Sequence, residues 1–246
     1  MSALRSMRVA TPLALVALVA SCGSTGSGAE LRPSATTAAM PNPNGPKAFV
    51  QGSRTPDANV VSLANSSAEV GSPAPDFELR DATGRSFRLS QFRGKLVVLE
   101  WFDPECPFVT YAYDDGPLAE METRYAATGI VWLSVYSTRA DRNDLAPAMV
   151  REFSDRRKLR APILIDAGGG VAKTFGALTT PHMFLVNERG VLVYSGALDN
   201  APMGRVERAA SKTNFVENAI GDLRSGHGVT TSSTRPYGSP LNYPRP

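Results

Sequence analysis

Residues 96–107 read Leu-Val-Val-Leu-Glu-Trp-Phe-Asp-Pro-Glu-Cys-Pro, an apolar run that passes through a turn to a cysteine. The run itself, 95–101, lies between a glycine and an aspartate, as expected for a strand buried on both faces of a sheet. Residues 108–127 have apolar side chains at helical spacing, and Gly116-Pro117 is expected to interrupt that helix. The stretch therefore predicts a central strand, a turn, and Cys106 at the start of a helix.

Strands alternate with helices on either side of this stretch. Before it, Asp81-Ala82-Thr83-Gly84 between alternating residues predicts a hairpin. After it, the patterns predict strands at 130–136 and 162–166, helices at 144–159, 171–175 and about 205–223, and an antiparallel pair at 183–186 and 191–194. This order is typical of an α/β fold with a mixed central sheet flanked by helices.

The first 22 residues have the pattern of an export signal. Arg5 and Arg8 precede an uncharged stretch, 9–20, and small residues precede a cysteine in Val19-Ala20-Ser21-Cys22. The apolar stretch is shorter than the roughly 20 residues that a helix needs to span a bilayer. The four residues resemble the bacterial lipobox, which implies that Cys22 becomes the lipidated first residue. The alternative is ordinary cleavage nearby, which leaves Cys22 as a plain thiol.

Composition divides the rest of the chain. Residues 23–68 are rich in Ser, Thr, Gly, Ala, Asn and Pro and have few large apolar side chains, so we expect a disordered tether. Residues 225–246 are similar and contain four prolines, which predicts a flexible C-terminal tail. Residues 69–224 are long enough to form one domain.

Charge and cysteine content narrow the function. The formal charge is +3, and loss of Arg5 and Arg8 with the signal would lower it to +1. The sequence has no basic stripe interleaved with aromatic residues and no phosphate-binding loop, so nucleic acid is not an expected partner. Of the two cysteines, Cys22 belongs to the export signal. The domain is therefore expected to carry one free thiol, Cys106.

Several motifs occur in the order of a known family. They are Gly71-Ser72-Pro73-Ala74-Pro75-Asp76-Phe77, Phe92-Arg93-Gly94-Lys95, Cys106-Pro107 and Thr179-Thr180-Pro181-His182-Met183-Phe184. Together they resemble the thioredoxin-fold redoxins of the thiol-specific antioxidant and alkyl hydroperoxide reductase group, over about residues 70–222. The resemblance implies a thioredoxin-like fold with an N-terminal hairpin extension. It also implies a peroxiredoxin-like thiol oxidoreductase or antioxidant, and we expect it to need no cofactor.

The resemblance assigns the site. Cys106 is the expected nucleophile, Pro181 the expected cis-proline of the loop that faces it, and Thr180 the residue that lines the site beside it. The backbone at Pro181 is expected to pair with an extended partner segment above the cysteine. The residues expected to support the site are Glu100, Trp101, Pro107 and His182.

Charges near the thiol have opposing effects. At a helix N-terminus, backbone amides and the helix dipole favour the reactive thiolate. Asp103 and Glu105 oppose it, because nearby carboxylates disfavour another anion. Glu100 has two interpretations: it is a buried acid, which the resemblance suggests as a proton acceptor, or its side chain points to a solvated edge.

Two supporting residues also have open alternatives. Trp101 either packs in the core or forms a wall of the site. His182 is either a core residue or a neighbour of Cys106 that favours the thiolate or shares a metal, such as copper, with it. Since these are only two candidate ligands, no metal is expected.

The second thiols of related mechanisms are missing. Thioredoxin-type exchange uses Cys-x-x-Cys, and the second position here is Val109. Residues 100–109 together with Thr234-Arg235-Pro236-Tyr237-Gly238 are similar to a narrower bacterial redoxin subgroup, whose tail often has a cysteine after Tyr-Gly. This chain has Ser239 there. Dithiol chemistry of either kind is excluded, so an external thiol must complete a reaction cycle.

The peroxide-activating pattern of peroxiredoxins is also absent. They place Pro and Thr before the cysteine in Pro-x-x-x-Thr-x-x-Cys, and the residues here are Leu99 and Asp103. Fast peroxide reduction is not expected, whereas slow reduction through a sulfenic acid is compatible with one cysteine. We predict an exported redoxin, lipid-anchored to the bacterial envelope on its periplasmic or outer-membrane face, in which Cys106 attacks a peroxide or a disulfide. The alternative is a non-catalytic thioredoxin-fold binding module that holds a partner in the cis-proline groove.

Overall fold

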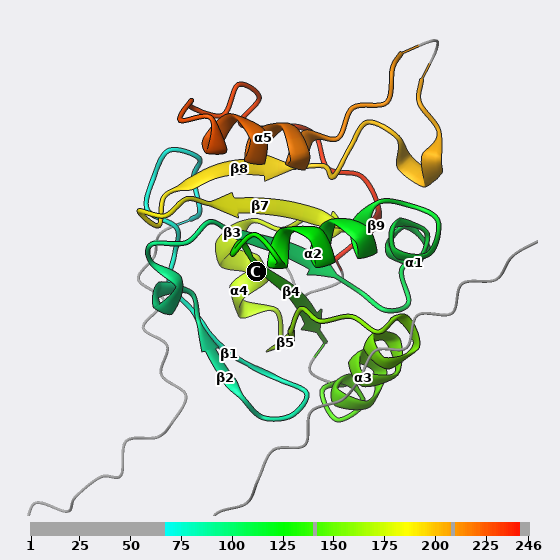
Figure 1. Cartoon of the computed structure of the whole chain (residues 1–246). Helices are drawn as coiled ribbons and strands as arrows, with labels where there is room; N and C mark the ends of the chain where they lie inside the picture. The colour runs from blue at the N-terminus through cyan, green and yellow to red at the C-terminus, as the bar shows by residue number, and fades with distance from the viewer. Residues whose placement is uncertain (1–66, 140–141, 208–209, 242–246) are drawn as a thin grey trace, which may run out of the picture. The chain divides into compact units, whose positions relative to one another are not determined.

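The computed structural model describes residues 67–139, 142–207 and 210–241 (Figure 1). The predicted export signal, 1–22, and residues 23–66 of the predicted tether lie outside them. The elements are, in chain order, β1 (Glu78–Asp81), β2 (Ser86–Arg88), η1 (Leu89–Phe92), β3 (Val97–Phe102), α1 (Pro107–Asp114), α2 (Leu118–Ala126), β4 (Val131–Thr138), α3 (Ala146–Arg157), β5 (Ile163–Ala167), α4 (Gly170–Phe175), β6 (Thr179–Thr180), β7 (His182–Val186), β8 (Leu192–Gly196), η3 (Pro202–Gly204), α5 (Phe215–Arg224) and β9 (Ser239–Pro240).

Within the described residues, the main sheet has the strand order β2-β1-β5-β4-β3-β7-β8. Strands β3, β4 and β5 are parallel, whereas β7 and β8 at one side and β1 and β2 at the other are antiparallel to their neighbours. The turn of the β1–β2 hairpin is held by the Asp81 carboxylate, which accepts from the amides of Thr83 and Arg85. The predictions of a mixed α/β sheet and of an N-terminal hairpin are confirmed.

Strand β3 lies inside the sheet, and all of its side chains are buried. It pairs in parallel with β4 and antiparallel with β7, where Trp101 lies opposite His182. A strand covered on both faces has no solvated side, which explains its continuous apolar sequence. The pairing brings the start of β7 to the end of β3, next to the turn that leads to Cys106.

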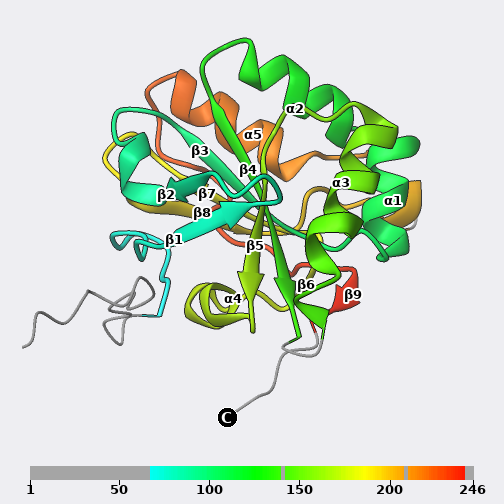
Figure 2. The same cartoon turned by 90° about the horizontal axis from the view of Figure 1, so that it is seen from below.

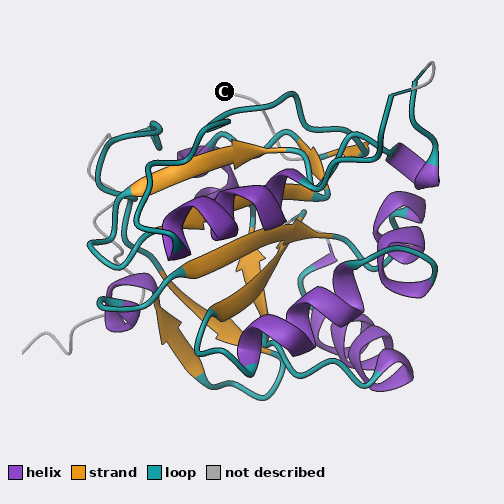
Figure 3. Cartoon of the chain, turned by 45° about the horizontal axis from the view of Figure 1, so that its top comes forward, coloured by secondary structure: helices purple, strands orange, loops and turns teal. Residues whose placement is uncertain are grey.

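Helices cover both faces of the sheet. Helices α1, α2, α3 and α5 lie on one face, and α4 lies on the other (Figure 2). Leu89 of η1 packs in the same core as α4. The same layering of strands between helices is visible in Figure 3. Alternate residues of β3 feed the two cores, since Val98 and Phe102 pack toward α1 while Leu99 and Trp101 pack toward α4. None of the helices in the described ranges combines the length and hydrophobicity needed to cross a bilayer.

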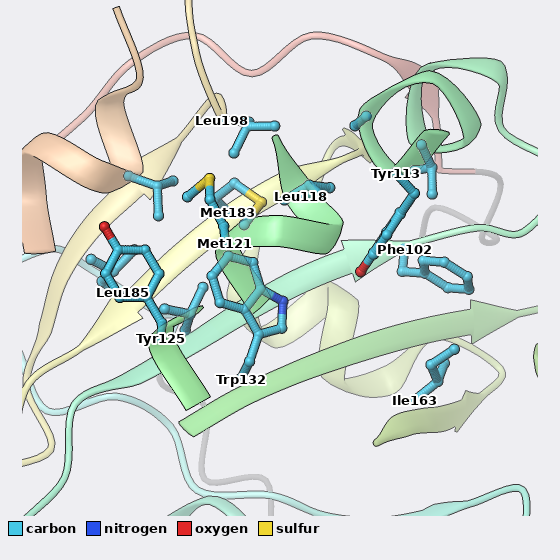
Figure 4. Close-up of a cluster of buried hydrophobic side chains, with 14 of the residues drawn as sticks. Phe102, Tyr113, Leu118, Met121, Tyr125, Trp132, Ile163, Met183, Leu185 and Leu198 are labelled. Atoms are coloured by element: carbon cyan, nitrogen blue, oxygen red, sulfur yellow. The ribbon is translucent and has the colours of Figure 1, made fainter. Parts of the chain in front are cut away.

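The core on the α1 side fixes the position of that helix. The Phe102 ring meets Tyr113 and Phe153 edge to face, with centroid distances of 6.2 and 4.8 Å. Figure 4 shows how side chains from α1, α2, β3, β4, β5 and β7 fill this cluster. Because Tyr113 lies on α1 and Phe102 on β3, the contact holds the helix that begins at Cys106 against the central strand.

The helical region after Cys106 is interrupted where the sequence predicts it. Helix α1 ends at Asp114 and α2 begins at Leu118. Pro117 lacks an N–H to continue the ladder, and a Cβ at Gly116 would lie 2.8 Å from the Ala112 carbonyl oxygen. The local sequence therefore determines the break.

The last helix begins later than the sequence predicts. The apolar pattern predicts a helix from about residue 205, but α5 begins at Phe215, and the described residues of 205–214 are not helical. The Asn214 side chain caps α5 by accepting from the Glu217 amide at 3.0 Å. Upstream, the Asn200 side chain donates to the Ser211 carbonyl and accepts from the Thr213 amide. These long-range hydrogen bonds hold the segment before the cap in an extended path.

The C-terminal segment, residues 225–241, differs from the separate tail that composition predicts. The Ser195 amide of β8 donates to the Ser232 carbonyl, and the Thr234 amide donates to the Ser195 carbonyl. Farther along, β9 pairs antiparallel with β6. Prolines do not prevent this docking, because the amides of neighbouring residues such as Leu241 make the hydrogen bonds. The expectation of a segment apart from the domain is therefore wrong for residues 225–241.

Candidate active site

Cys106 lies at the N-terminal end of α1, directly after the turn that follows β3. The Cys106 amide donates to the Asp103 carbonyl at 3.1 Å, and the Asp103 carboxylate accepts from the Glu105 amide at 2.8 Å. Pro107 occupies the first helical position, where its missing N–H costs no helical hydrogen bond. The sequence prediction of a cysteine at a helix start is confirmed. The turn aims the thiol at the carboxyl-terminal edge of β3.

The thiol is enclosed rather than exposed. Cys106 is 2% exposed, and its Sγ lies 2.9 Å from the Thr180 carbonyl oxygen and 3.1 Å from Ser239 Oγ. A thiol carries one proton, so it donates to one of these oxygens at a time. When the sulfur is a thiolate, the Ser239 hydroxyl is able to donate to it, whereas the carbonyl oxygen at 2.9 Å is repulsive. These two oxygens therefore enclose the sulfur on two sides.

The loop opposite the cysteine is placed by the β3–β7 pairing. The Thr180–Pro181 peptide bond is cis, as the sequence predicts, and both residues are buried. Thr180 contacts the cysteine through its backbone carbonyl, while its side chain is 1% exposed. Cys106, Thr180 and Pro181 are thus brought together as expected, although Thr180 acts through its main chain.

Ser239 is the contact that sequence reasoning missed. It belongs to β9, whose residues Ser239 and Pro240 lie opposite Thr180 and Thr179 of β6. The one signal for this placement is Tyr237-Gly238, whose resemblance to a redoxin subgroup drew attention to the missing cysteine rather than to the serine. No local pattern predicts the pairing, because both strands have two residues and are far apart along the chain.

Glu100 is a buried acid, so the interpretation of a solvated edge is wrong. The carboxyl is 0% exposed, and one oxygen accepts from the Tyr113 hydroxyl at 2.8 Å and the Trp132 indole at 3.1 Å. Burial raises the pKa of Glu100 to about 7, although these hydrogen bonds oppose the shift. Glu100 Oε1 is buried without a hydrogen-bond partner in the described residues. No direct hydrogen bond joins Glu100 to the thiol among the described residues.

The two carboxylates of the turn, on Asp103 and Glu105, each interact with a neighbouring group. Burial raises the pKa of Asp103, while the hydrogen bond from the Glu105 amide opposes that rise. The Glu105 carboxylate pairs with Arg142 at 2.7 Å. The repulsion that the sequence predicts between these acids and a thiolate is therefore weakened by an arginine from the loop before α3.

Trp101 and His182 lie on the α4 side of the sheet rather than beside the thiol. Trp101 is 0% exposed, packs on Phe184 at 5.0 Å, and donates its indole N–H to Ser137. The His182 ring accepts from the Leu178 amide at 3.2 Å, and burial lowers its pKa to about 4, so it is neutral. Both residues therefore belong to the core, and among the described residues no group of three potential metal ligands occurs.

A thiol at a helix start that faces a cis-proline loop across the end of a mixed sheet is the arrangement of the thioredoxin-fold redoxins. Sequence comparison narrows this class. The chain belongs to the AhpC/TSA family, whose model matches residues 70–195.

Curated relatives carry names of redox proteins. The chain is 30% identical over 132 residues to the thiol-disulfide oxidoreductase ResA of Bacillus thuringiensis subsp. konkukian, which covers 51% of this chain and 68% of the relative. It is 28% identical over 122 residues to the thioredoxin-like protein YneN of Bacillus subtilis, covering 50% and 68% of the two chains. These names agree with the expectation of an oxidoreductase.

Two solved structures share the fold over most of the described residues. A hypothetical protein of Sinorhizobium meliloti 1021 has 27% identity and a TM-score of 0.63, covering 73% of this chain and 97% of that protein. An uncharacterized conserved protein of Geobacillus kaustophilus has 22% identity and the same TM-score, covering 72% and 93%. The second likeness bears on the fold alone.

Proposed function

We propose that this protein is a single-cysteine thiol-disulfide oxidoreductase. The observation that carries the proposal is the contact of the Cys106 sulfur with the Thr180 carbonyl at 2.9 Å, since it places the thiol against the loop where a redoxin meets its substrate. Cys106 is the one cysteine of the described residues, and the position three residues later holds Val109, which is fully buried. The names of the relatives favour a disulfide over a peroxide as the substrate.

The reaction balances with one protein thiol. The Cys106 thiolate attacks a substrate disulfide, forms a mixed disulfide with one sulfur, and releases the other sulfur as a thiolate. An external thiolate then attacks the mixed disulfide at the substrate sulfur, and Cys106 leaves as the thiolate. A second external thiol reduces the remaining disulfide, so two external thiols supply the electrons. The protein accelerates the exchange and returns unchanged.

The surrounding residues have separate roles in this proposal. Pro181 and the Thr180 carbonyl form the wall against which the attacked sulfur lies, and Pro107 starts the helix that presents the thiol. Glu100 holds α1 through Tyr113, and its pKa of about 7 suits the proton acceptor that the resemblance suggests, acting at a distance from the thiol. Trp101 and His182 contribute packing.

A slower peroxide reaction uses the same nucleophile. Attack of the thiolate on a peroxide breaks the oxygen–oxygen bond, leaves a sulfenic acid on Cys106, and releases hydroxide or an alkoxide. An external thiol would then form a mixed disulfide and water. Asp103, at the position where peroxiredoxins have a threonine, is an acid whose pKa is raised by burial. It is a poorer peroxide-activating group when ionised, so disulfide exchange is the primary proposal.

A non-catalytic binding module is the second candidate. It is favoured by the 2% exposure of Cys106, since a thiol that never reacts is able to remain enclosed. The two candidates differ in what the thiol contributes. A binding module keeps its partner when Cys106 is replaced by Ser, whereas an oxidoreductase loses the covalent complex.

Intact-mass kinetics test the oxidoreductase. The full chain carrying Cys22→Ser is incubated with oxidised glutathione, and the glutathione adduct at Cys106 is followed with time and after addition of reduced thiol. We expect an adduct that forms faster than on an unfolded cysteine peptide, that disappears with thiol, and that is absent in Cys106→Ser. Adduct rates no faster than that of the peptide, both in this chain and in a chain shortened to end at Pro236, would contradict the proposal and leave the binding module.

The envelope anchor is a separate part of the proposal. Residues 1–22 carry the export pattern, and lipidation of Cys22 would tether the redoxin domain to a membrane on the periplasmic or outer-membrane face. The mass of the chain extracted from a bacterial membrane fraction tests it. We expect a diacylated N-terminal cysteine, and we expect the Cys22→Ser chain to leave the membrane fraction. An unmodified N-terminus at another residue would show ordinary cleavage instead.

A further inference from the structure

The residues of the C-terminal segment that reach the site form a continuous cover over the thiol. Residues 237–241, which we name the covering strand, contain β9 and pair antiparallel with Thr179–Thr180. The pairing places Ser239 Oγ 3.1 Å from the Cys106 sulfur. On the other side, the Leu241 amide donates to the Leu178 carbonyl at 2.9 Å. The backbone edge beside the cis-proline is therefore already paired.

The covering strand is anchored at its start. The Tyr237 hydroxyl donates a 2.6 Å hydrogen bond to the Asp199 carboxylate, which is 3% exposed, and the Tyr237 ring lies 6.1 Å from that of Phe108 on α1. The Tyr237 carbonyl also accepts from the Thr179 hydroxyl at 3.3 Å. A chance surface contact would not give the Tyr237 hydroxyl, which is the one polar atom of that side chain, a buried acceptor.

The fit of the covering strand depends on a glycine. Gly238 has a φ of 135°, and a Cβ at this position would lie 2.0 Å from the Thr180 carbonyl oxygen. This is the same oxygen that contacts the Cys106 sulfur. Because Gly238 lies so close to the Thr180 carbonyl, the next residue, Ser239, reaches the Cys106 sulfur.

A reacting disulfide needs the space that the covering strand fills. Thiol–disulfide exchange requires the attacking sulfur to approach an S–S bond, and Cys106 is 2% exposed. The Thr180 carbonyl oxygen and the Ser239 hydroxyl block approach to the sulfur from two sides. Thr180 adjoins β7, which is paired inside the main sheet, whereas Ser239 belongs to a strand of two residues. Displacing the covering strand frees both the sulfur and the paired edge at Thr179–Thr180.

We propose that the covering strand is an internal occupant of the substrate-binding edge, which must leave before a disulfide can reach Cys106. The identity of the molecule that replaces the covering strand rests on the proposed function. That molecule is an extended polypeptide that pairs with Thr179–Thr180 and carries a disulfide sulfur at the place of Ser239 Oγ. The enclosed form is the resting form, and the form with the covering strand released is the reactive one.

Alkylation of the thiol tests the cover independently of disulfide chemistry. Full-length Cys22→Ser chain is compared with the same chain ending at Pro236, and the rate of iodoacetamide addition to Cys106 is followed by intact mass. We expect at least a roughly ten-fold faster reaction in the shortened chain, because the enclosed sulfur becomes accessible. Equal rates within about two-fold would overturn the proposal. Far-ultraviolet circular dichroism and thermal melting establish that the shortened chain is folded.

Three further variants distinguish covering of the thiol by the covering strand from other effects of shortening the chain. Gly238→Val in the full-length chain is expected to approach the shortened chain, because its side chain cannot pass Thr180. Ser239→Ala keeps the strand and removes the hydroxyl, so it is expected to react at about the parent rate; a rate equal to the shortened chain would assign the effect to the hydrogen bond and overturn the cover. Ser233→Ala, in the same segment but beside β8, is the matched control and is expected to behave as the parent.

The covering strand supplied in trans completes the test. Addition of the peptide Tyr-Gly-Ser-Pro-Leu to the shortened chain is expected to slow alkylation toward the parent rate, and a peptide with Val in place of Gly is expected not to. Absence of any effect of the first peptide at millimolar concentration would contradict occupancy of the edge.

Oxidised glutathione on the same chains distinguishes the two proposals. One outcome is fast alkylation of the shortened chain with a glutathione adduct rate in that chain no better than that of an unfolded peptide. It would support the covering strand and refute the oxidoreductase. Fast adduct formation that is equal in the full-length and shortened chains would retain the oxidoreductase and refute the cover.

Discussion

The Tyr113 hydroxyl donates a 2.8 Å hydrogen bond to the Glu100 carboxyl and so joins α1, which begins after Cys106, to the central strand β3. The same carboxyl oxygen accepts from the Trp132 indole on β4. One acid thus connects three elements of the core. Its protonation state is therefore a property of the fold as well as of the site.

Glu100→Gln is expected to change how stability depends on pH. The folded state holds the Glu100 proton up to about pH 7, whereas the unfolded chain loses it near 4.5. The contribution of Glu100 to the free energy of unfolding should therefore fall by about 3 kcal/mol as the pH rises from 4.5 through 7. Gln carries no such proton, so the fall disappears. Urea titrations of both chains below and above this window measure the difference, and parallel curves would contradict it.

His182→Asn is expected to remove a loss of stability that occurs at acid pH. Burial lowers the pKa of His182 to about 4, while the unfolded histidine titrates near 6.5. The contribution of His182 to the free energy of unfolding should therefore fall by about 3 kcal/mol as the pH falls from 6.5 to 4, opposite in sign to the Glu100 contribution. Asn retains an acceptor for the Leu178 amide and does not titrate. Urea titrations at neutral pH and at the acid end of this range test this, and an equal acid loss in both chains would refute it.

Val109→Cys is expected to allow an intramolecular disulfide with Cys106. Residues three apart at a helix start have Cβ atoms about 5–6 Å apart, within the reach of a disulfide after small adjustment. Val109 is fully buried, so the substitution also costs about 1 kcal/mol in packing. In the Cys22→Ser background, intact mass after mild oxidation should show loss of two hydrogens without dimer formation. A product that consists of intermolecular dimers would contradict the helical geometry.

Ser239→Cys is expected to form an intramolecular disulfide of a different kind. Ser239 Oγ lies 3.1 Å from the Cys106 sulfur, so a sulfur in its place needs little movement to reach bonding distance. Peptide mapping of the oxidised Cys22→Ser chain should recover a disulfide between Cys106 and the introduced cysteine. Ser233→Cys serves as the control, since Ser233 lies opposite Ser195 of β8. Equal oxidation of both variants would show that the covering strand is not placed as described.

Tyr237→Phe is expected to destabilise the docking of the C-terminal segment. The substitution removes the donor to Asp199 and leaves that buried carboxylate with the Ala201 amide and a distant Lys212. A loss of about 1–3 kcal/mol in unfolding free energy is typical when a buried charged acceptor loses a partner. A double-mutant cycle with Asp199→Ala measures the coupling. Strictly additive losses would show that the two side chains do not interact.

Local patterns predicted the part of the fold that local chemistry determines. The apolar run before Cys106, the Gly116-Pro117 break and the hairpin at Asp81 each depend on neighbouring residues, and each is present. Alternation was a poor guide for Glu100, because a strand covered on both faces offers no solvated side. In such a strand an acid is buried wherever it points.

The errors came from contacts between distant residues. The start of α5 is set by Asn200 and Asn214, whose side chains bond backbone groups of the loop and helix. The place of residues 225–241 depends on backbone pairing and on Tyr237 with Asp199, and neither has a periodic signature. Polar, proline-rich composition describes a segment without its own core, but it does not exclude docking on another one.

The C-terminal segment also closes the free side of β8, the last strand of the sheet order. Ser233 forms a parallel bridge with Ser195, and the Thr234 hydroxyl accepts from the Ala197 amide. Uncovered strand edges invite association with other chains, and this half of the segment covers the outer edge of β8. A release that is confined to residues after Pro236 would open the thiol while the edge of β8 stays covered. Pro236 thus lies between the part of the segment that covers the edge of β8 and the part that covers the thiol.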